Sequence, residues 1–181
     1  MKANTNLIRN RWLLYLSLIL LSIVVSCQSE NHLVLEPVGP SSSGSPSGKL
    51  SFVGTGFLVV YSATETRYAG KFDKSYPHTP YLIFSQDGKR LKWVENSTVA
   101  SDEAPTVVRL PAGSYVVRAQ DDDYGRVTVP VVIQDGQTTT VRLEMRGTRA
   151  VGQPDASRSV RLPDGRVVGW RAREPAAEPM K

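Results

Sequence analysis

The side chains best suited to nucleophilic or metal chemistry are few in this sequence of 181 residues. It contains one cysteine, Cys27, and two histidines, His32 and His78. A single thiol excludes an intramolecular disulfide and a zinc site built from several cysteines. The sequence also contains no nucleophile elbow, no paired carboxylates and no phosphate-binding glycine loop before a helix. We therefore expect a non-catalytic protein that holds neither a metal ion nor a cofactor.

The one acidic run, Asp121-Asp122-Asp123, is the strongest candidate for a cation site. Calcium takes about six to eight oxygen ligands, and carboxylates in a loop could supply some of them. Consecutive side chains in a strand point in opposite directions, however, so a solvated turn between two strands is the preferred interpretation. His78 has no second ligand at a suitable spacing, and His32 is expected to be an exposed residue without a partner.

The first 26 residues combine a basic start with an apolar run. Lys2, Arg9 and Arg11 precede residues 12–25 (WLLYLSLILLSIVV), which carry no charge. This run is shorter than the roughly 20 apolar residues that a membrane-spanning helix needs. It has the length and the basic flank of a signal peptide. The alternative is an uncleaved membrane anchor.

The residues at the end of this run, Val24-Val25-Ser26-Cys27, resemble the lipobox of bacterial lipoproteins. The resemblance implies that Cys27 receives diacylglycerol, that residues 1–26 are removed, and that the new amino group is acylated. Such chains anchor a protein because each buried CH₂ contributes about 0.8 kcal/mol. Gln28 follows the cysteine, and a residue other than Asp at this position favours the outer membrane in the bacterial sorting rule. The membrane is therefore the expected partner of the lipid anchor.

A polar segment separates Cys27 from the rest of the chain. Residues 27–49 are rich in Ser, Gly and Pro, which predicts a flexible, lipid-anchored linker. Removal of residues 1–26 takes away three basic side chains and no acidic one, so the net charge falls from +5 to +2. Because a nucleic-acid interface needs clustered basic residues on the folded domain, we expect no nucleic-acid partner.

Residues 50–145 contain short runs of β-branched and aromatic residues separated by turn signals. The runs at 81–85 and 91–94 flank Asp87-Gly88, which predicts a hairpin. About seven such runs in this stretch predict an all-β domain, a single small antiparallel β-sandwich. Pro130 predicts an edge strand or a bulge, because proline cannot donate a hydrogen bond to a neighbouring strand. The remaining runs are 57–62, 106–110, 115–119, 126–133 and 138–144.

Two residues are expected to be central to this domain. Pro111-Ala112-Gly113 reads as a turn that reverses one strand onto the next, with a positive φ at Gly113. Tyr115 then enters the following strand on the side that faces the core, together with Val117, while Arg118 faces outward. Along residues 138–143, the odd-numbered positions are expected to face the core in the same way.

The stretch 110–119 (LPAGSYVVRA) resembles the strand–turn–strand of PEGA, carboxypeptidase regulatory-like and transthyretin-like modules. Residues 129–143 resemble the terminal hairpin of these modules, and residues 56–60 (GFLVV) resemble their opening strand. The resemblance implies a seven-stranded sandwich with a binding, spacer or presentation role in envelope proteins. It carries no catalytic residues that could be transferred to this chain.

Residues 146–181 form a basic tail in which apolar runs surround Pro163-Asp164-Gly165. This pattern predicts an accessory hairpin or a segment that becomes ordered on binding, and a solvated tail is the alternative. Trp170 in this tail and Tyr76 in a proline-flanked loop are the candidate ligand contacts, since exposed aromatic rings stack on sugars or peptides. Core packing is the alternative for each aromatic residue.

These patterns together predict a lipid-anchored envelope protein with a binding or structural role, whose partner is an envelope protein or glycan. The alternative is an enzyme that acts on envelope glycans through residues scattered along the sequence. Two carboxylates, or a histidine beside a carboxylate, in one cleft would favour the enzyme. An open sheet face with aromatic side chains and no such cluster would favour binding.

Overall fold

The computed structural model describes residues 32–40, 54–68, 73–97, 103–145 and 156–172, all within the unit His32–Lys181. The predicted signal peptide and Cys27 lie outside the described residues. Within the described ranges, no helix is long and apolar enough to cross a membrane. These ranges form β-strands, connecting loops and one short 3-10 helix, Ala156–Arg158.

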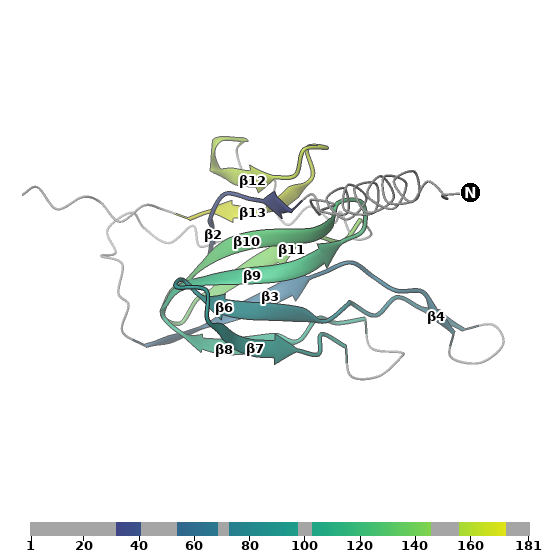
Figure 1. Ribbon diagram of the computed structural model, residues 1–181, viewed down its shortest axis with the longest axis horizontal. Coiled ribbons are helices and arrows are strands. Elements are labelled where there is room, and N and C mark those ends of the chain that lie inside the picture. Colours follow the sequence, from purple (N-terminus) through teal and green to yellow (C-terminus); the bar gives the residue numbers. More distant parts are fainter. Residues whose placement is uncertain (1–31, 41–53, 69–72, 98–102, 146–155, 173–181) are drawn as a thin grey trace, which may run out of the picture. The chain divides into compact units, whose positions relative to one another are not determined.

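The larger of two sheets contains eight strands (Figure 1). Seven of them follow the order β12-β13-β2-β10-β9-β6-β7, and β1 pairs with β10 beside β2. The pairs β10–β9, β9–β6 and β6–β7 are antiparallel, whereas β1 and β2 run parallel to β10. The strands are β1 (Leu33–Val34), β2 (Val38–Gly39), β6 (Tyr81–Ser85), β7 (Arg90–Val94), β9 (Gly113–Asp121), β10 (Gly125–Ile133), β12 (Ser159–Arg161) and β13 (Val167–Arg171).

The smaller sheet has three strands in the order β11-β3-β8. They are β3 (Thr55–Tyr61), β8 (Val107–Pro111) and β11 (Thr138–Arg142), with β11 parallel and β8 antiparallel to β3. A separate ribbon pairs β4 (Arg67–Tyr68) with β5 (Lys74–Ser75). The fold is thus the predicted β-sandwich, but thirteen strands are present in the described residues where about seven were expected.

The core lies between the two sheets and is built from alternate residues of each strand. Leu58 and Val60 of β3 are fully buried, as are Val117 of β9 and Val141 of β11. The alternation predicted for residues 115–119 and 138–143 is confirmed, since Ala119, Thr139 and Leu143 are also buried while Arg118 is exposed. One apolar face per strand is what a two-layer sandwich requires.

Two predicted strand reversals are wrong, although the predicted hairpin between β6 and β7 is confirmed. The segment at Pro111-Ala112-Gly113 carries the chain from β8 in the small sheet to β9 in the large sheet. The residues between β10 and β11 make the same change of sheet, so the expected terminal hairpin does not form. A turn signal predicts that the chain changes direction, but the pairing partner of each strand depends on the whole sandwich.

Residues 32–40 are part of the large sheet rather than the linker expected for 27–49. Val38 is fully buried and pairs with Val131 of β10. Residues 41–49, the rest of the predicted linker, lie outside the described residues. The added strands place β10 inside the sheet, so the prediction that Pro130 marks an edge strand is wrong.

The sheet accommodates Pro130 through an interruption in its neighbour. β1 pairs with residues 127 and 128 of β10, and β2 pairs with residue 131. The backbone carbonyl of Thr128 accepts a hydrogen bond from the N–H of Leu35, so the backbone groups of residue 128 point toward the side of β1 and β2. Those of residue 130 point to the same side, because alternate residues of a strand do so, and there they face the gap between β1 and β2. The missing N–H of proline therefore interrupts no ladder hydrogen bond at this point.

The basic tail contains the predicted accessory hairpin. β12 and β13 pair antiparallel, and β13 pairs with β2 through Trp170 and Arg171. Val160, Leu162 and Val168 of this hairpin are buried in the common core. The hairpin therefore extends the large sheet, and the sandwich reaches beyond both predicted limits of 50 and 145.

Candidate functional site

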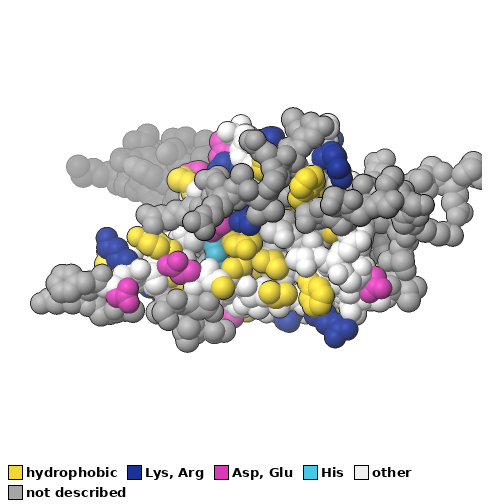
Figure 2. Space-filling model, turned by 180° about the vertical axis from the view of Figure 1, so that it is seen from behind, with side chains coloured by type: hydrophobic (Ala, Val, Ile, Leu, Met, Phe, Trp, Pro, Cys, Tyr) yellow, Lys and Arg dark blue, Asp and Glu magenta, His cyan; other side chains and the backbone are white. Residues whose placement is uncertain are grey.

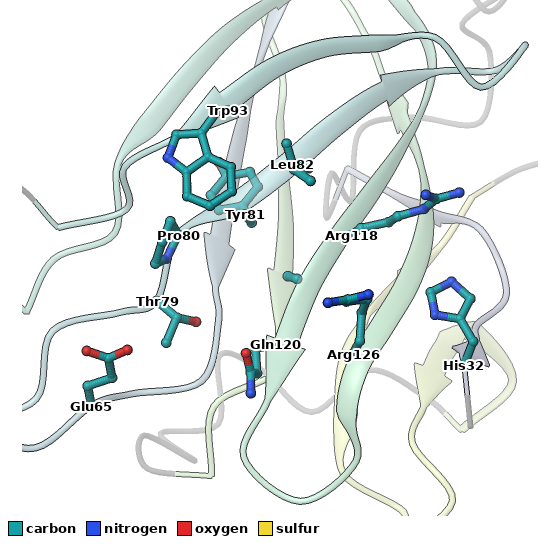
Figure 3. A pocket seen from close by; sticks show the side chains of 11 residues that line it. His32, Glu65, Thr79, Pro80, Tyr81, Leu82, Trp93, Arg118, Gln120 and Arg126 are labelled. Carbon is teal, nitrogen blue, oxygen red and sulfur yellow. The ribbon is translucent and has the colours of Figure 1, made fainter. Parts of the chain in front are cut away.

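A groove of about 480 Å³ lies on the outer face of the large sheet, where β6, β7, β9 and β10 run side by side. Its lining combines an indole ring, an aliphatic floor and several polar or charged side chains. Figure 3 shows Arg118, Arg126 and His32 on one side, and Glu65, Thr79 and Pro80 on the other. Trp93 and Leu82 lie at its upper end in this view.

Strand register places the three main groove residues in one row. Leu82 of β6 is directly opposite Trp93 of β7 on one side and Arg118 of β9 on the other. Tyr81 and Val94, the neighbouring pair, are buried in the core, so Leu82 and Trp93 face outward. Neighbouring strands are about 4.8 Å apart, which puts the backbones of Trp93 and Arg118 roughly 10 Å apart.

Trp93 presents its ring to solvent while its polar atom is already bonded. The side chain is 56% exposed, and its indole Nε1 donates a hydrogen bond to Glu95 Oε2 at 3.2 Å. Because the N–H already has a partner, the ring face is the part that remains available for contact. Such a face attracts C–H groups and cations through its electron density.

Arg118 is held in place by an aromatic ring from the neighbouring strand. Its guanidinium carbon lies 4.4 Å from the centroid of the Phe84 ring, and Phe84 itself is buried. A guanidinium that packs on an aromatic ring can still donate hydrogen bonds from the N–H groups at its edge. Among the described residues, no carboxylate forms an ion pair with Arg118.

The other end of the groove is formed by His32 and by the pair Gln120 and Arg126. His32, expected to have no partner, bonds through Nε2 to the hydroxyl of Thr128. Thr128 is buried on β10, directly opposite Arg118. Gln120 and Arg126 are opposite each other in the same pair of strands, two residues further along. The groove therefore carries an excess of basic groups on this side.

A histidine and a carboxylate do meet in the structure, but inside the protein rather than in the groove. His78 Nε2 lies 3.6 Å from Glu144 Oε2, and the two side chains are only 3% and 11% exposed. His78 Nδ1 is 2.8 Å from the carbonyl oxygen of Ser62, and Tyr61 packs edge-on against the imidazole. Burial raises the pKa of Glu144, while the neighbouring His78 and Arg142 oppose the shift. Little of either side chain is therefore open to solvent.

The carboxylates of the acidic run hold the fold together. Asp121 Oδ1 accepts hydrogen bonds from the backbone N–H groups of Asp123 and Tyr124, and its side chain is buried. Asp122 accepts the N–H groups of Thr64 and Met145. The expected solvated turn is thus partly buried and heavily bonded. No group of three potential metal ligands occurs in the ranges that the structure describes.

Neither candidate ligand contact from the sequence lies in the groove. Tyr76 is half-buried in the loop after β5, where its backbone N–H donates to Glu103. Trp170 is half-buried in β13, and Arg158 lies 5.4 Å from its ring. Both residues are half-buried, and neither belongs to the hydrophobic core or to the residues packed against it.

The two residues expected to be central to the domain, Tyr115 and Gly113, lie at the start of β9. Tyr115 is half-buried against the core, and its hydroxyl donates a hydrogen bond to the carbonyl of Pro111 at 2.9 Å. Gly113 has a φ of 158°, close to extended backbone, and it begins β9. Asn96, the first residue of a glycosylation sequon, is 1% exposed and bonds through its amide to Val60 and Ser62.

Sequence reasoning identified Trp93 only as one aromatic residue among several and Arg118 only as an outward-facing residue. The alternation within each strand was the available signal, since it puts both side chains on the outer face. Their alignment depends on the register between three strands, which single-strand patterns do not specify.

Comparison of the chain with protein-family models, curated proteins and solved structures finds no match. The resemblances to bacterial lipoproteins and to PEGA-like modules therefore stay predictions from the residues that carry them.

Proposed function

We propose that this protein is a non-catalytic binding module and that its ligand occupies the groove on the outer face of the large sheet. The observation that carries the proposal is the row formed by Trp93, Leu82 and Arg118. It combines an exposed ring, an aliphatic floor and an oriented cation in one concave surface. Ligand sites commonly combine an apolar lining with a few polar groups placed in this way.

The positions of the titratable groups support binding over catalysis. His78 Nε2 and Glu144 Oε2 lie 3.6 Å apart outside the groove, and only 3% and 11% of their side chains are exposed. Glu65 and His32 both line the groove, yet Figure 3 shows them on opposite sides of it. General acid–base catalysis needs its groups within hydrogen-bond reach of one reacting centre. The proposal therefore assigns the groove to recognition.

The proposal places the module in the bacterial envelope, attached to the outer membrane through lipid on Cys27. The lipobox pattern before Cys27 supports this location. The charge of +2 after removal of residues 1–26 supports a ligand other than nucleic acid. On the face shown in Figure 2, the basic side chains of the described residues are scattered rather than gathered in one patch.

Photo-crosslinking in cells that carry the full chain tests whether the groove is occupied. A photoreactive phenylalanine analogue replaces Leu91, which is 47% exposed and lies two residues from Trp93 on the same strand. The same analogue at Val107, 62% exposed on β8 of the small sheet, is the matched control. We expect an adduct at position 91 that disappears when Leu82→Arg blocks the groove, and none at position 107. Equal adducts at both positions, or one that survives Leu82→Arg, would contradict the proposal.

A further inference from the structure

We infer that the ligand of the groove is a saccharide that carries a carboxylate, with a sugar ring on Trp93 and the carboxylate on Arg118. This inference rests on the proposed function and adds the chemical class of the ligand. It follows from the charge of the groove, from the span between its two main residues, and from the way each residue is held.

Charge favours an anionic ligand. Arg118 forms no ion pair with a carboxylate among the described residues, its guanidinium carbon lies over the Phe84 ring, and the residue is exposed. Arginine binds carboxylates through two parallel hydrogen bonds from the N–H edge of its guanidinium. The acidic lining residue, Glu65, is on the opposite side and is paired with Arg67 at 3.3 Å.

The span of the row suits a short saccharide. Two strand spacings separate Trp93 from Arg118, a backbone distance of roughly 10 Å. Leu82 between them provides a flat aliphatic floor. A sugar ring stacked on the indole can therefore place a carboxylate, on the same ring or the next, at the guanidinium. Gln120 lines the groove, is exposed, and offers its amide to the hydroxyls.

The geometry favours a saccharide over an acidic peptide. An extended peptide binds to a sheet by pairing with an edge strand, because its main chain needs backbone partners. The groove instead lies across the outer faces of β6, β7, β9 and β10 and reaches an edge of the sheet only at β7, so most of its lining offers side chains. The N–H of Trp93 is already bonded to Glu95, so the indole contributes its face. Stacking of aliphatic C–H groups on that face is the contact that a sugar ring provides.

Binding of a polyuronate and its uncharged derivative to the detergent-solubilised full chain tests the inference. The probes are polygalacturonate, the same polymer with its carboxylates methyl-esterified, and poly-glutamate as the acidic peptide. We expect polygalacturonate to bind at least tenfold more tightly than the ester, and poly-glutamate to bind no better than the ester. Arg118→Gln should abolish the preference for the acid, and Arg118→Lys should restore it in part. Trp93→Ala should weaken the binding of polygalacturonate and its ester alike.

Two exposed residues outside the groove provide matched controls. Tyr68→Ala removes an aromatic ring that is 63% exposed, and Arg109→Gln removes an arginine from the small sheet. Neither change should alter the affinity for polygalacturonate. Thermal melts of all variants check that each is folded.

The other results would separate this inference from the proposed function. Equal affinity for the acid and the ester would overturn the acidic class while leaving groove binding intact. Tighter binding of poly-glutamate, independent of Trp93, would replace the saccharide with a peptide. Failure of every polymer to bind, with the crosslink at position 91 retained, would overturn the inference alone. Loss of that crosslink as well would overturn both.

Discussion

The Arg166 guanidinium lies 3.1 Å from Oδ1 of Asp121 and joins the hairpin of β12 and β13 to the turn between β9 and β10. The Asp121 side chain has no exposed surface, and Arg166 is 18% exposed. Arg166 also contacts Asp123 and Asp164. The C-terminal hairpin is therefore held by a partly buried charge cluster as well as by its apolar side chains.

Arg166→Met should destabilise the fold by about 3 kcal/mol, because it leaves the buried carboxylate of Asp121 without its cation. The matched control is Arg171→Met. Arg171 pairs with Glu36 at 2.6 Å, but both side chains are about half exposed, so this change should cost about 0–1 kcal/mol. Urea unfolding of both variants measures the difference. Equal costs would show that the Arg166 cluster contributes no more than a surface pair.

Glu144→Gln should stabilise the protein at neutral pH and have little effect in acid. Burial raises the pKa of Glu144 above its ordinary value of 4.5, and the nearby Asp122 raises it further. His78 and Arg142 act in the opposite direction, but the net effect is a raised pKa. A raised pKa means that the folded state favours the neutral carboxyl. The stability that this group contributes is therefore complete below pH 4.5 and is lost as the pH rises through its pKa in the folded state.

Thermal melts at about pH 4 and about pH 8 measure this effect, since glutamine reproduces the neutral carboxyl at both values. The melting temperature of Glu144→Gln should match the wild type in acid and exceed it at the higher pH. Glu65→Gln, on an exposed residue, is the control. A lower melting temperature for Glu144→Gln at about pH 8 would mean that the ion pairs of Glu144 outweigh its burial.

A chain of residues 32–172 should unfold in one cooperative transition and be more stable by several kcal/mol than residues 50–145. The shorter chain lacks five buried hydrophobic side chains, Leu35, Val38, Val160, Leu162 and Val168. Burial of each contributes about 1.5–3 kcal/mol. The shorter chain also exposes one edge of β10, which should promote aggregation. Urea melts compare the two chains, and identical midpoints would show that the added strands contribute nothing to stability.

Variants along β9 test its register. Val117→Ala, at a fully buried position, should cost about 2 kcal/mol through lost methyl groups and the resulting cavity. Tyr115→Phe should cost about 0.5–1.5 kcal/mol, because it removes the hydrogen bond to Pro111. Arg118→Gln, at an exposed position, should change stability least. If Arg118→Gln is the most damaging in denaturant melts, the inward and outward sets must be exchanged.

Cys27→Ala should release the protein from the membrane, because it removes the site of the acyl chains that are predicted to anchor the chain. Metabolic labelling with a palmitate analogue measures the modification directly. We expect label on the wild-type chain and none on the variant. An unlabelled wild-type chain would contradict the lipoprotein prediction.

The sequence by itself determined the class of the fold and several of its elements. Alternation of apolar and polar residues identified the strands, because one buried face per strand is a local property of a sandwich. Asp87-Gly88 predicted the hairpin of β6 and β7, and Pro163-Asp164-Gly165 predicted that of β12 and β13. In each case the signal and the structure that it specifies lie within a few residues of each other.

Only the tertiary structure decided how these elements are combined. β1 and β2 have two residues each, too few to show a period, and they form because β10 offers an unpaired edge. Asp121 and Arg166 are 45 residues apart, and neither residue type predicts the other as its partner. The row of Trp93, Leu82 and Arg118 depends on the register of three strands. Register is set by pairing between distant segments, so the candidate site appears only when the sheet is assembled.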